Sequence, residues 1–178
     1  MPTPEGTLPW RPLLDALDLV APSIAEAARA GALPSARVAP IDATLADTEA
    51  FCAAYDVALE SSANCIVVQA RRGETTTVAA VLVLATDRAD INKTVRKHLG
   101  ARKITFAAHE DTEAAAGMES GGITPVGLPE EWPILVDQHV VDAGPVVIGG
   151  GVRGSKILVP GVELATLPSA EVLALTLD

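Results

Sequence analysis

Residues 65–84 read Cys-Ile-Val-Val-Gln-Ala-Arg-Arg-Gly-Glu-Thr-Thr-Thr-Val-Ala-Ala-Val-Leu-Val-Leu. This stretch decides the fold class, because residues 65–68 and 75–84 are rich in the β-branched residues that favour strands. The turn-like sequence at 71–74 lies between them and predicts an antiparallel hairpin. Since a tight hairpin joins antiparallel strands, it favours a mixed sheet over a regular parallel Rossmann sheet.

Helices and strands are intermixed on both sides of this hairpin. Helices are predicted at residues 13–20, in an Ala-rich segment from Ser23 to Gly31, and at 47–59, 90–99 and 110–116. Further strands are predicted at residues 37–41, 103–106, 134–136, 145–148 and 156–159. We therefore expect an α/β fold, a single domain with a mixed, largely antiparallel sheet flanked by helices.

The chain is expected to divide into a leader and one domain. Residues 1–12 hold four prolines and no periodic pattern, which predicts a flexible or loosely docked segment. We expect a leader with short N-terminal helices over residues 1–35 and the functional domain over residues 36–178.

Composition indicates a cytoplasmic protein. The two cysteines, Cys52 and Cys65, are too few for a disulfide framework, and the first residues lack the pattern of a secretion signal. Apolar runs reach roughly ten residues, where a membrane span needs about 20. No membrane partner is expected.

The net charge and the distribution of charge lead to opposite predictions about binding to nucleic acid. A net charge of −10 argues against an anionic partner. One segment is nevertheless basic, with Arg88, Lys93, Arg96, Lys97, Arg102 and Lys103 against the single acid Asp90. This segment is either a solvated helix face or a surface for phosphates. No helix-turn-helix pattern is present, so DNA is not expected as a partner.

Motifs for metals, cofactors and activated nucleophiles are absent from the sequence. It contains no Walker-type loop, no G-x-S-x-G elbow and no H-E-x-x-H pair, and its histidines, His98, His109 and His139, are scattered. We therefore predict no metal site and no cofactor. Cys65 could be a nucleophile, but its place at the start of an apolar strand favours a small buried hydrophobe.

Two glycine-rich stretches remain. Residues 149–151 precede another strand pattern, which favours a bend between strands over a nucleotide loop. Residues 117–129, Gly-Met-Glu-Ser-Gly-Gly-Ile-Thr-Pro-Val-Gly-Leu-Pro, hold four glycines and two prolines. Such a loop is either an ordinary long turn or a set of backbone N–H groups that bind a carbonyl oxygen or oxyanion.

The order of these motifs resembles the YbaK/EbsC family of prolyl-tRNA-editing domains. Residues 121–127 look like the family's G-x-x-x-P loop, and the basic segment ends in a similar L-G-A-x-K pattern at 99–103. Residues 134–137 resemble its V-D strand end, and residues 148–154 resemble its glycine segment with R-G. The resemblance spans roughly residues 60–160.

The resemblance implies a hydrolase, an aminoacyl-tRNA deacylase that cleaves the ester of a mischarged tRNA carrying a small amino acid, such as Cys- or Ala-charged tRNA for proline. Its implied site residues fall into three groups. The oxyanion would be stabilised at Gly121, Gly122, Ile123 and Thr124. The substrate pocket would be lined by Asn64, Pro125, Asp137, Gly149 and Gly150. Phosphates of the tRNA would meet Lys93, Arg96 and Lys97. An aminoacyl-tRNA synthetase is a further implied partner.

One position departs from the family pattern. Many members carry a lysine where this sequence has Asn64, and asparagine supplies no positive charge. Either the chain recognises its substrate differently, or it is a non-catalytic module that binds tRNA or a small ligand. A purely structural role for Asn64, bonded near the entry of its strand, is the third alternative.

Overall fold

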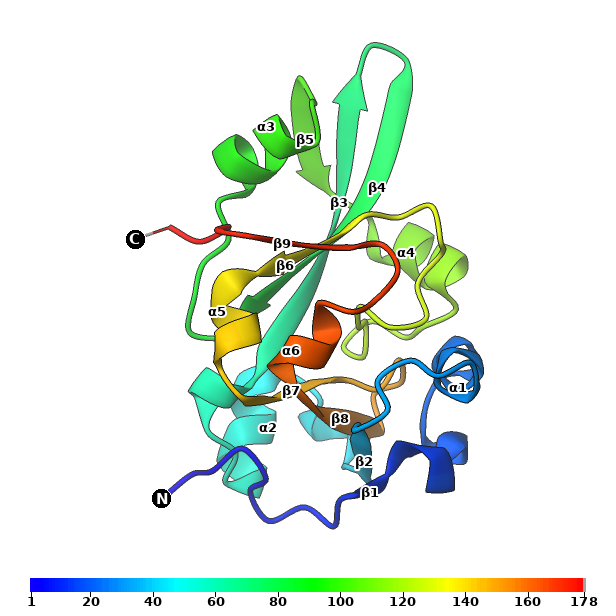
Figure 1. Cartoon of the computed structure of the whole chain (residues 1–178), viewed down its shortest axis with the longest axis vertical. Helices are drawn as coiled ribbons and strands as arrows, with labels where there is room; N and C mark the ends of the chain where they lie inside the picture. Colours follow the sequence, from blue (N-terminus) through cyan, green and yellow to red (C-terminus); the bar gives the residue numbers. More distant parts are fainter. Residues whose placement is uncertain (178) are drawn as a thin grey trace.

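The predicted hairpin is the longest feature of the molecule and extends from one end of it (Figure 1). In the computed structural model, which describes residues 1–177, β3 (Ala63–Arg72) and β4 (Thr75–Leu84) pair antiparallel along their whole length. Gly73 adopts a φ of +62° in the turn between them. The hairpin prediction is confirmed.

The hairpin forms the centre of a five-stranded mixed sheet with the order β5-β3-β4-β6-β9. The other strands of this sheet are β5 (Lys103–Phe106), β6 (Ile134–Asp137) and β9 (Ala170–Leu173). Strand β5 runs antiparallel to β3, whereas β6 runs parallel to β4 and β9 runs parallel to β6. The mixed character expected from the sequence is therefore present.

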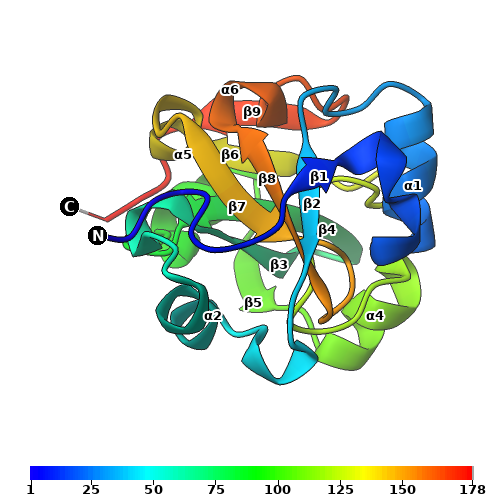
Figure 2. The same ribbon diagram turned by 90° about the horizontal axis from the view of Figure 1, so that it is seen from below.

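A second, antiparallel sheet of four strands has the order β1-β2-β8-β7 (Figure 2). Its strands are β1 (Arg11–Pro12), β2 (Arg37–Pro40), β7 (Pro145–Gly149) and β8 (Ser155–Pro160). A single bridge between Ser62 and Val147 connects the two sheets. The α/β class with its flanking helices is confirmed, but the strands form two sheets where the sequence suggested one, because strand patterns do not identify pairing partners.

Short helices connect and cover these sheets. They are η1 (Leu13–Asp15), η2 (Leu17–Leu19), α1 (Pro22–Arg29), η3 (Ala43–Leu45), α2 (Thr48–Tyr55), η4 (Leu59–Ser61), η5 (Ile91–Val95), α3 (Arg96–His98), α4 (His109–Ala116), α5 (Gln138–Asp142) and α6 (Gly161–Leu164). The predicted helix at 13–20 is wrong in type: it consists of two 3-10 turns, broken at Ala16, whose φ is −145°. The predicted helix at 90–99 is a π turn followed by one short α-helical turn.

The main hydrophobic core lies between the two sheets. Along β4, Ala80 and Leu82 face this core, whereas Val81 and Val83 face a smaller cluster on the other side of the larger sheet. This alternation is the period of two that a strand buried on both faces requires.

The N-terminal segment packs against the same structure. Leu13 belongs to the main core, and the backbone N–H groups of Thr3 and Thr7 donate to the carbonyl oxygens of Asp56 and Tyr55 at the end of α2. The division between a leader over 1–35 and a domain over 36–178 stays a prediction. None of the helices in the part of the chain that the structure describes has the length and apolar character needed to cross a membrane.

Candidate functional site

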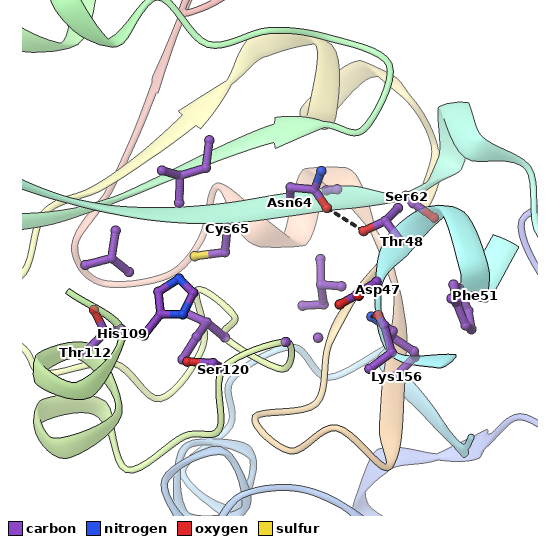
Figure 3. Close-up of a pocket in the computed structure, with 18 of the residues that line it drawn as sticks. Asp47, Thr48, Phe51, Ser62, Asn64, Cys65, His109, Thr112, Ser120 and Lys156 are labelled. Carbon is purple, nitrogen blue, oxygen red and sulfur yellow. Dashed lines mark hydrogen bonds between the residues drawn. The ribbon is translucent and has the colours of Figure 1, made fainter. Parts of the chain in front are cut away.

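A cavity of about 390 Å³ lies where the two sheets approach each other (Figure 3). The beginning of β3 forms one wall, and β7 with β8 contributes another. The remaining walls come from residues 46–51, from residues 106–112 and from the glycine loop at residues 120–123. Five segments of the chain therefore meet around one space.

The two glycine-rich stretches hold each other in place beside this cavity. The N–H of Gly151 donates to the carbonyl oxygen of Gly122 (2.7 Å), and the N–H of Glu119 donates to the carbonyl oxygen of Gly151 (2.9 Å). A Cβ atom on Gly122 would lie 2.6 Å from the carbonyl oxygen of Val152. Glycine is therefore required at position 122 by the close approach of two backbones.

The loop amides differ in their availability to a ligand. Gly122 donates its N–H to the carbonyl oxygen of Glu119 (2.9 Å), so that amide is already used. The N–H groups of Gly121 and Ile123 have no acceptor among residues 1–177, and both residues line the cavity. Thr124 is fully buried and does not line it. Of the four predicted oxyanion residues, Gly121 and Ile123 are therefore the two that both line the cavity and keep an N–H group without an acceptor among residues 1–177.

Arg153 fixes the loop against the segment that precedes α2. Its Nη1 donates to the carbonyl oxygen of Ser120 (3.2 Å), its Nε donates to that of Ala43 (3.2 Å), and Nη2 lies 3.7 Å from Asp47. A single guanidinium therefore joins two walls of the cavity.

The predicted pocket residues divide into two groups. Asn64 and Gly149 line the cavity, and Asn64 accepts a hydrogen bond from the hydroxyl of Thr48 (2.7 Å). Pro125 and Gly150 do not line it. The carbonyl oxygen of Gly150 instead accepts the N–H of Ala21 (3.0 Å).

Asp137 also lies outside the cavity and has a structural role. Its buried carboxylate accepts the N–H of His139 (3.1 Å), which caps α5, and the N–H of Leu175 (2.8 Å). With Asp87 and His139 it forms a group whose ligand atoms lie within 4.8 Å of one another and could hold a cation. The hydrogen bond to Asp87 (2.8 Å), and then the charge of Asp137, raise the pKa of His139.

The basic residues predicted to meet tRNA lie away from the cavity, on η5 and α3 beside β5 (Figure 1). Lys93 and Lys97 are exposed. Arg96 is half-buried and donates to the carbonyl oxygen of Asn92 (2.8 Å), which holds part of its guanidinium in the local structure. None of the three lines the cavity.

Two basic residues that the sequence did not indicate line the cavity, Lys156 and His109. Lys156 extends from β8, is 7% exposed and donates from Nζ to the carbonyl oxygen of Ala46 (2.9 Å). Burial lowers the pKa of Lys156. His109, the first residue of α4, reaches the opposite side of the cavity near Cys65 (Figure 3). A lysine within a mostly apolar strand could have indicated Lys156. No sequence pattern indicates His109.

Cys65 lines the cavity but is poorly suited to act as a nucleophile. Burial of the thiol raises the pKa of Cys65 to about 12, so the reactive thiolate is disfavoured near neutral pH. This favours the apolar role for the side chain. Phe106, on the wall formed by residues 106–112, is 68% exposed.

Comparison with known proteins gives one family match and two related enzymes. The sequence profile of the aminoacyl-tRNA editing domain matches residues 42–167. The proline–tRNA ligase of Limosilactobacillus fermentum is 38% identical over 61 residues, covering 34% of this chain and 11% of the ligase. The enzyme of the same name from Leuconostoc mesenteroides is 33% identical over 75 residues, covering 42% of this chain and 13% of the ligase. These matches span about an eighth of each ligase or less.

The fold is also similar to a solved structure, a protein described as a candidate trans-editing enzyme for prolyl tRNA synthetase. The TM-score is 0.72 at 22% identity, over 89% of this chain and 99% of that one. At this identity the likeness concerns the fold. The family profile covers well over half of the sequence and includes every segment of the cavity wall. The resemblance to YbaK/EbsC is thereby confirmed, and the chain belongs to the family of aminoacyl-tRNA editing domains.

Proposed function

We propose that the protein is an aminoacyl-tRNA deacylase, which hydrolyses the ester between a small amino acid and the terminal adenosine of a mischarged tRNA. The observation that carries this proposal is the cavity wall formed by Gly121 and Ile123. Their N–H groups have no acceptor among residues 1–177, and both residues border a space large enough for a ligand. Such donors stabilise the oxyanion of a tetrahedral intermediate without a charged side chain.

The nucleophile in this scheme is water, with the neighbouring ribose hydroxyl of the substrate as a proton relay. Cys65 is not required, because its thiol stays protonated. Binding places the ester carbonyl against the loop, and this positioning supplies a large part of the rate enhancement.

Cavity size supports a small amino acid. A volume of about 390 Å³ must hold the terminal ribose together with the aminoacyl group. Val67 and Ala107 line the cavity on the side of Cys65, and this apolar lining suits a short, weakly polar side chain such as that of cysteine or alanine. The similarity to proline–tRNA ligases supports a tRNA for proline as the carrier.

Exposed positive charges outside the cavity are the candidates for contacts with the rest of the tRNA. Lys93 and Lys97 are exposed cations on an acidic protein and would meet phosphates of the acceptor stem. An aminoacyl-tRNA synthetase that releases the mischarged tRNA is the natural protein partner, and such a role belongs in the cytoplasm.

The second candidate function is a module that binds tRNA or a small ligand without hydrolysis. Asn64 favours it, because the resemblance to YbaK/EbsC implies a lysine at this position and the amide oxygen of Asn64 is already bonded to Thr48. The two candidates share the cavity and differ only in turnover.

Deacylation of proline tRNA charged with cysteine, alanine or serine tests the proposal. Gly121→Ala is the informative variant, because Gly121 has a φ of +91° and its added Cβ would lie 2.0 Å from Nη1 of Arg153. Gly154→Ala is the matched control, since a Cβ there meets no atom within 4 Å. We expect wild-type turnover to fall at least about tenfold in Gly121→Ala and to persist in Gly154→Ala. Tight binding of these tRNAs without turnover would support the binding module instead.

A further inference from the structure

Lys156 is a buried ammonium group on the wall of the cavity. It has three N–H donors, and one of them is used by the carbonyl oxygen of Ala46 (2.9 Å). Its Nζ also lies 5.1 Å from the centre of the Phe51 ring, a cation–π contact that orients the side chain. Both neighbours belong to the wall from which α2 begins.

No carboxylate within residues 1–177 lies within 4.0 Å of this ammonium group. The acid on the same wall, Asp47, lies 3.7 Å from Nη2 of Arg153. Removing a charge from water is costly unless an opposite charge or several hydrogen bonds compensate. A buried cation beside a cavity, with donors left over, is therefore arranged for an anionic ligand.

Lys156 brings to the cavity a positive charge that Asn64 does not supply. Asn64 comes from β3 and Lys156 comes from β8, and both side chains border the same cavity (Figure 3). The neutral amide at position 64 is tied to Thr48. The cavity thus retains one ammonium group, but a strand of the other sheet supplies it.

We infer that Lys156 binds a negatively charged oxygen of the substrate, a role that the resemblance to YbaK/EbsC implies for a lysine at the position of Asn64. This inference rests on the proposed function. The substrate offers negatively charged oxygens at two places. One is the phosphodiester that precedes the terminal adenosine, and the other is the oxyanion that forms at the ester carbon. The α-ammonium group of the substrate is repelled by Lys156, so we expect it to point away from this side chain.

Two minimal substrates separate these oxygens. Alanyl-adenosine contains the ester but no phosphate, whereas alanyl-cytidylyl-adenosine contains both. The variants are Lys156→Met, which keeps the length of the side chain, and the double variant Asn64→Lys/Lys156→Met, which returns an ammonium group from the other wall. Arg29→Met, at the exposed end of α1, is the control for loss of one positive charge.

We expect Lys156→Met to lower kcat/KM by about tenfold to a hundredfold, with partial recovery in the double variant and no change in Arg29→Met. A loss confined to the phosphate-bearing substrate identifies the phosphodiester, and an equal loss on both substrates identifies the oxyanion. Full activity of a folded Lys156→Met on both substrates overturns the inference.

Binding measurements test the role of Lys156 even if the protein has no deacylase activity. If the wild-type protein hydrolyses neither substrate, the binding of cytidylyl-adenosine and of adenosine is measured by titration calorimetry. Weaker binding of the dinucleotide alone in Lys156→Met then supports an anion site at Lys156. Equal affinity of the wild type and Lys156→Met for the dinucleotide overturns it.

Discussion

A Cβ atom on Gly149 would lie 2.5 Å from the carbonyl oxygen of Gly122. The last residue of β7 and the glycine loop are therefore in direct backbone contact at the edge of the cavity. That contact places the N–H groups of Gly121 and Ile123 relative to the other walls. A change of one methyl group at position 149 consequently acts on the proposed oxyanion site without touching its donors.

Gly149→Ala is expected to displace the loop. The neighbouring atom is backbone and cannot move away as a flexible side chain would, so we expect a loss of about 1–3 kcal/mol in the free energy of unfolding. We also expect kcat/KM for deacylation to fall by about a hundredfold, because the reacting geometry tolerates little displacement. Urea unfolding and kcat/KM measure the two effects. Gly154→Ala should leave both unchanged; if Gly149→Ala did so as well, the contact would not set the loop position.

Arg153 is expected to be irreplaceable by lysine. Its guanidinium bonds Ser120 and Ala43 from two different nitrogens, and a single ammonium group cannot span both carbonyl oxygens. The side chain is about one-third exposed, so Arg153→Lys should cost only about 1 kcal/mol of unfolding free energy. We expect kcat to fall at least about tenfold, with unchanged secondary structure by circular dichroism. Wild-type kcat in Arg153→Lys would assign the residue to packing alone.

Lys156→Met is expected to stabilise the protein at neutral pH. Burial lowers the pKa of Lys156, so the folded state holds fewer protons than the unfolded state between that pKa and the usual lysine value of about 10.4. Wild-type stability should therefore rise with pH through that window, and this rise should be absent from Lys156→Met. At pH 7 we expect a gain of about 1 kcal/mol in the variant. Urea titrations from pH 7 to pH 10 measure the stability of the wild type and of Lys156→Met. If Lys156→Met were less stable at pH 7, the hydrogen bond to Ala46 and the cation–π contact with Phe51 would contribute more free energy than burial of the ammonium group costs.

The sequence predicts the hairpin well because its strands are long, β-branched and separated by a turn. It fails at residues 13–20, where the apolar spacing fits two tight 3-10 turns that bury Leu13 and Ala16, three residues apart. Helices α5 and α6 are four or five residues long, too short for a helical period to be visible.

The site is predictable only in part, for a related reason. The glycine loop is local in sequence, so composition identifies it. Lys156 enters the site through the pairing of β8 with β2 and β7, where it lies opposite Ala39 and Gly149. Such a juxtaposition depends on the register of three strands and leaves no mark in the chain except an isolated lysine in an apolar run.

His139 is expected to titrate above the usual value of about 6.5. Its hydrogen bond to Asp87 is the largest cause, followed by the charge of Asp137. A raised pKa means that the ion pair contributes stability below the unfolded pKa and that this contribution is lost as pH rises through the folded pKa. NMR titration should give a lower pKa for His139 in Asp87→Asn than in the wild type. The decrease of Tm between pH 6 and pH 8 should also be smaller in that variant. An unchanged pKa of His139 in Asp87→Asn would contradict the assignment.

Cys65 is expected to be unreactive even though it lines the cavity. Desolvation raises the pKa of its thiol to about 12, so only a minute fraction is thiolate at pH 8, whereas an exposed cysteine is about one-quarter ionised there. Iodoacetamide should therefore leave Cys65 unmodified in the folded protein and modify it in urea, as mass spectrometry of the peptides would reveal. Cys65→Ala should keep deacylation within about threefold of wild type, because water is the nucleophile in the proposed reaction. Rapid alkylation of Cys65 in the native state, together with loss of turnover in Cys65→Ala, would replace the water mechanism by a covalent one.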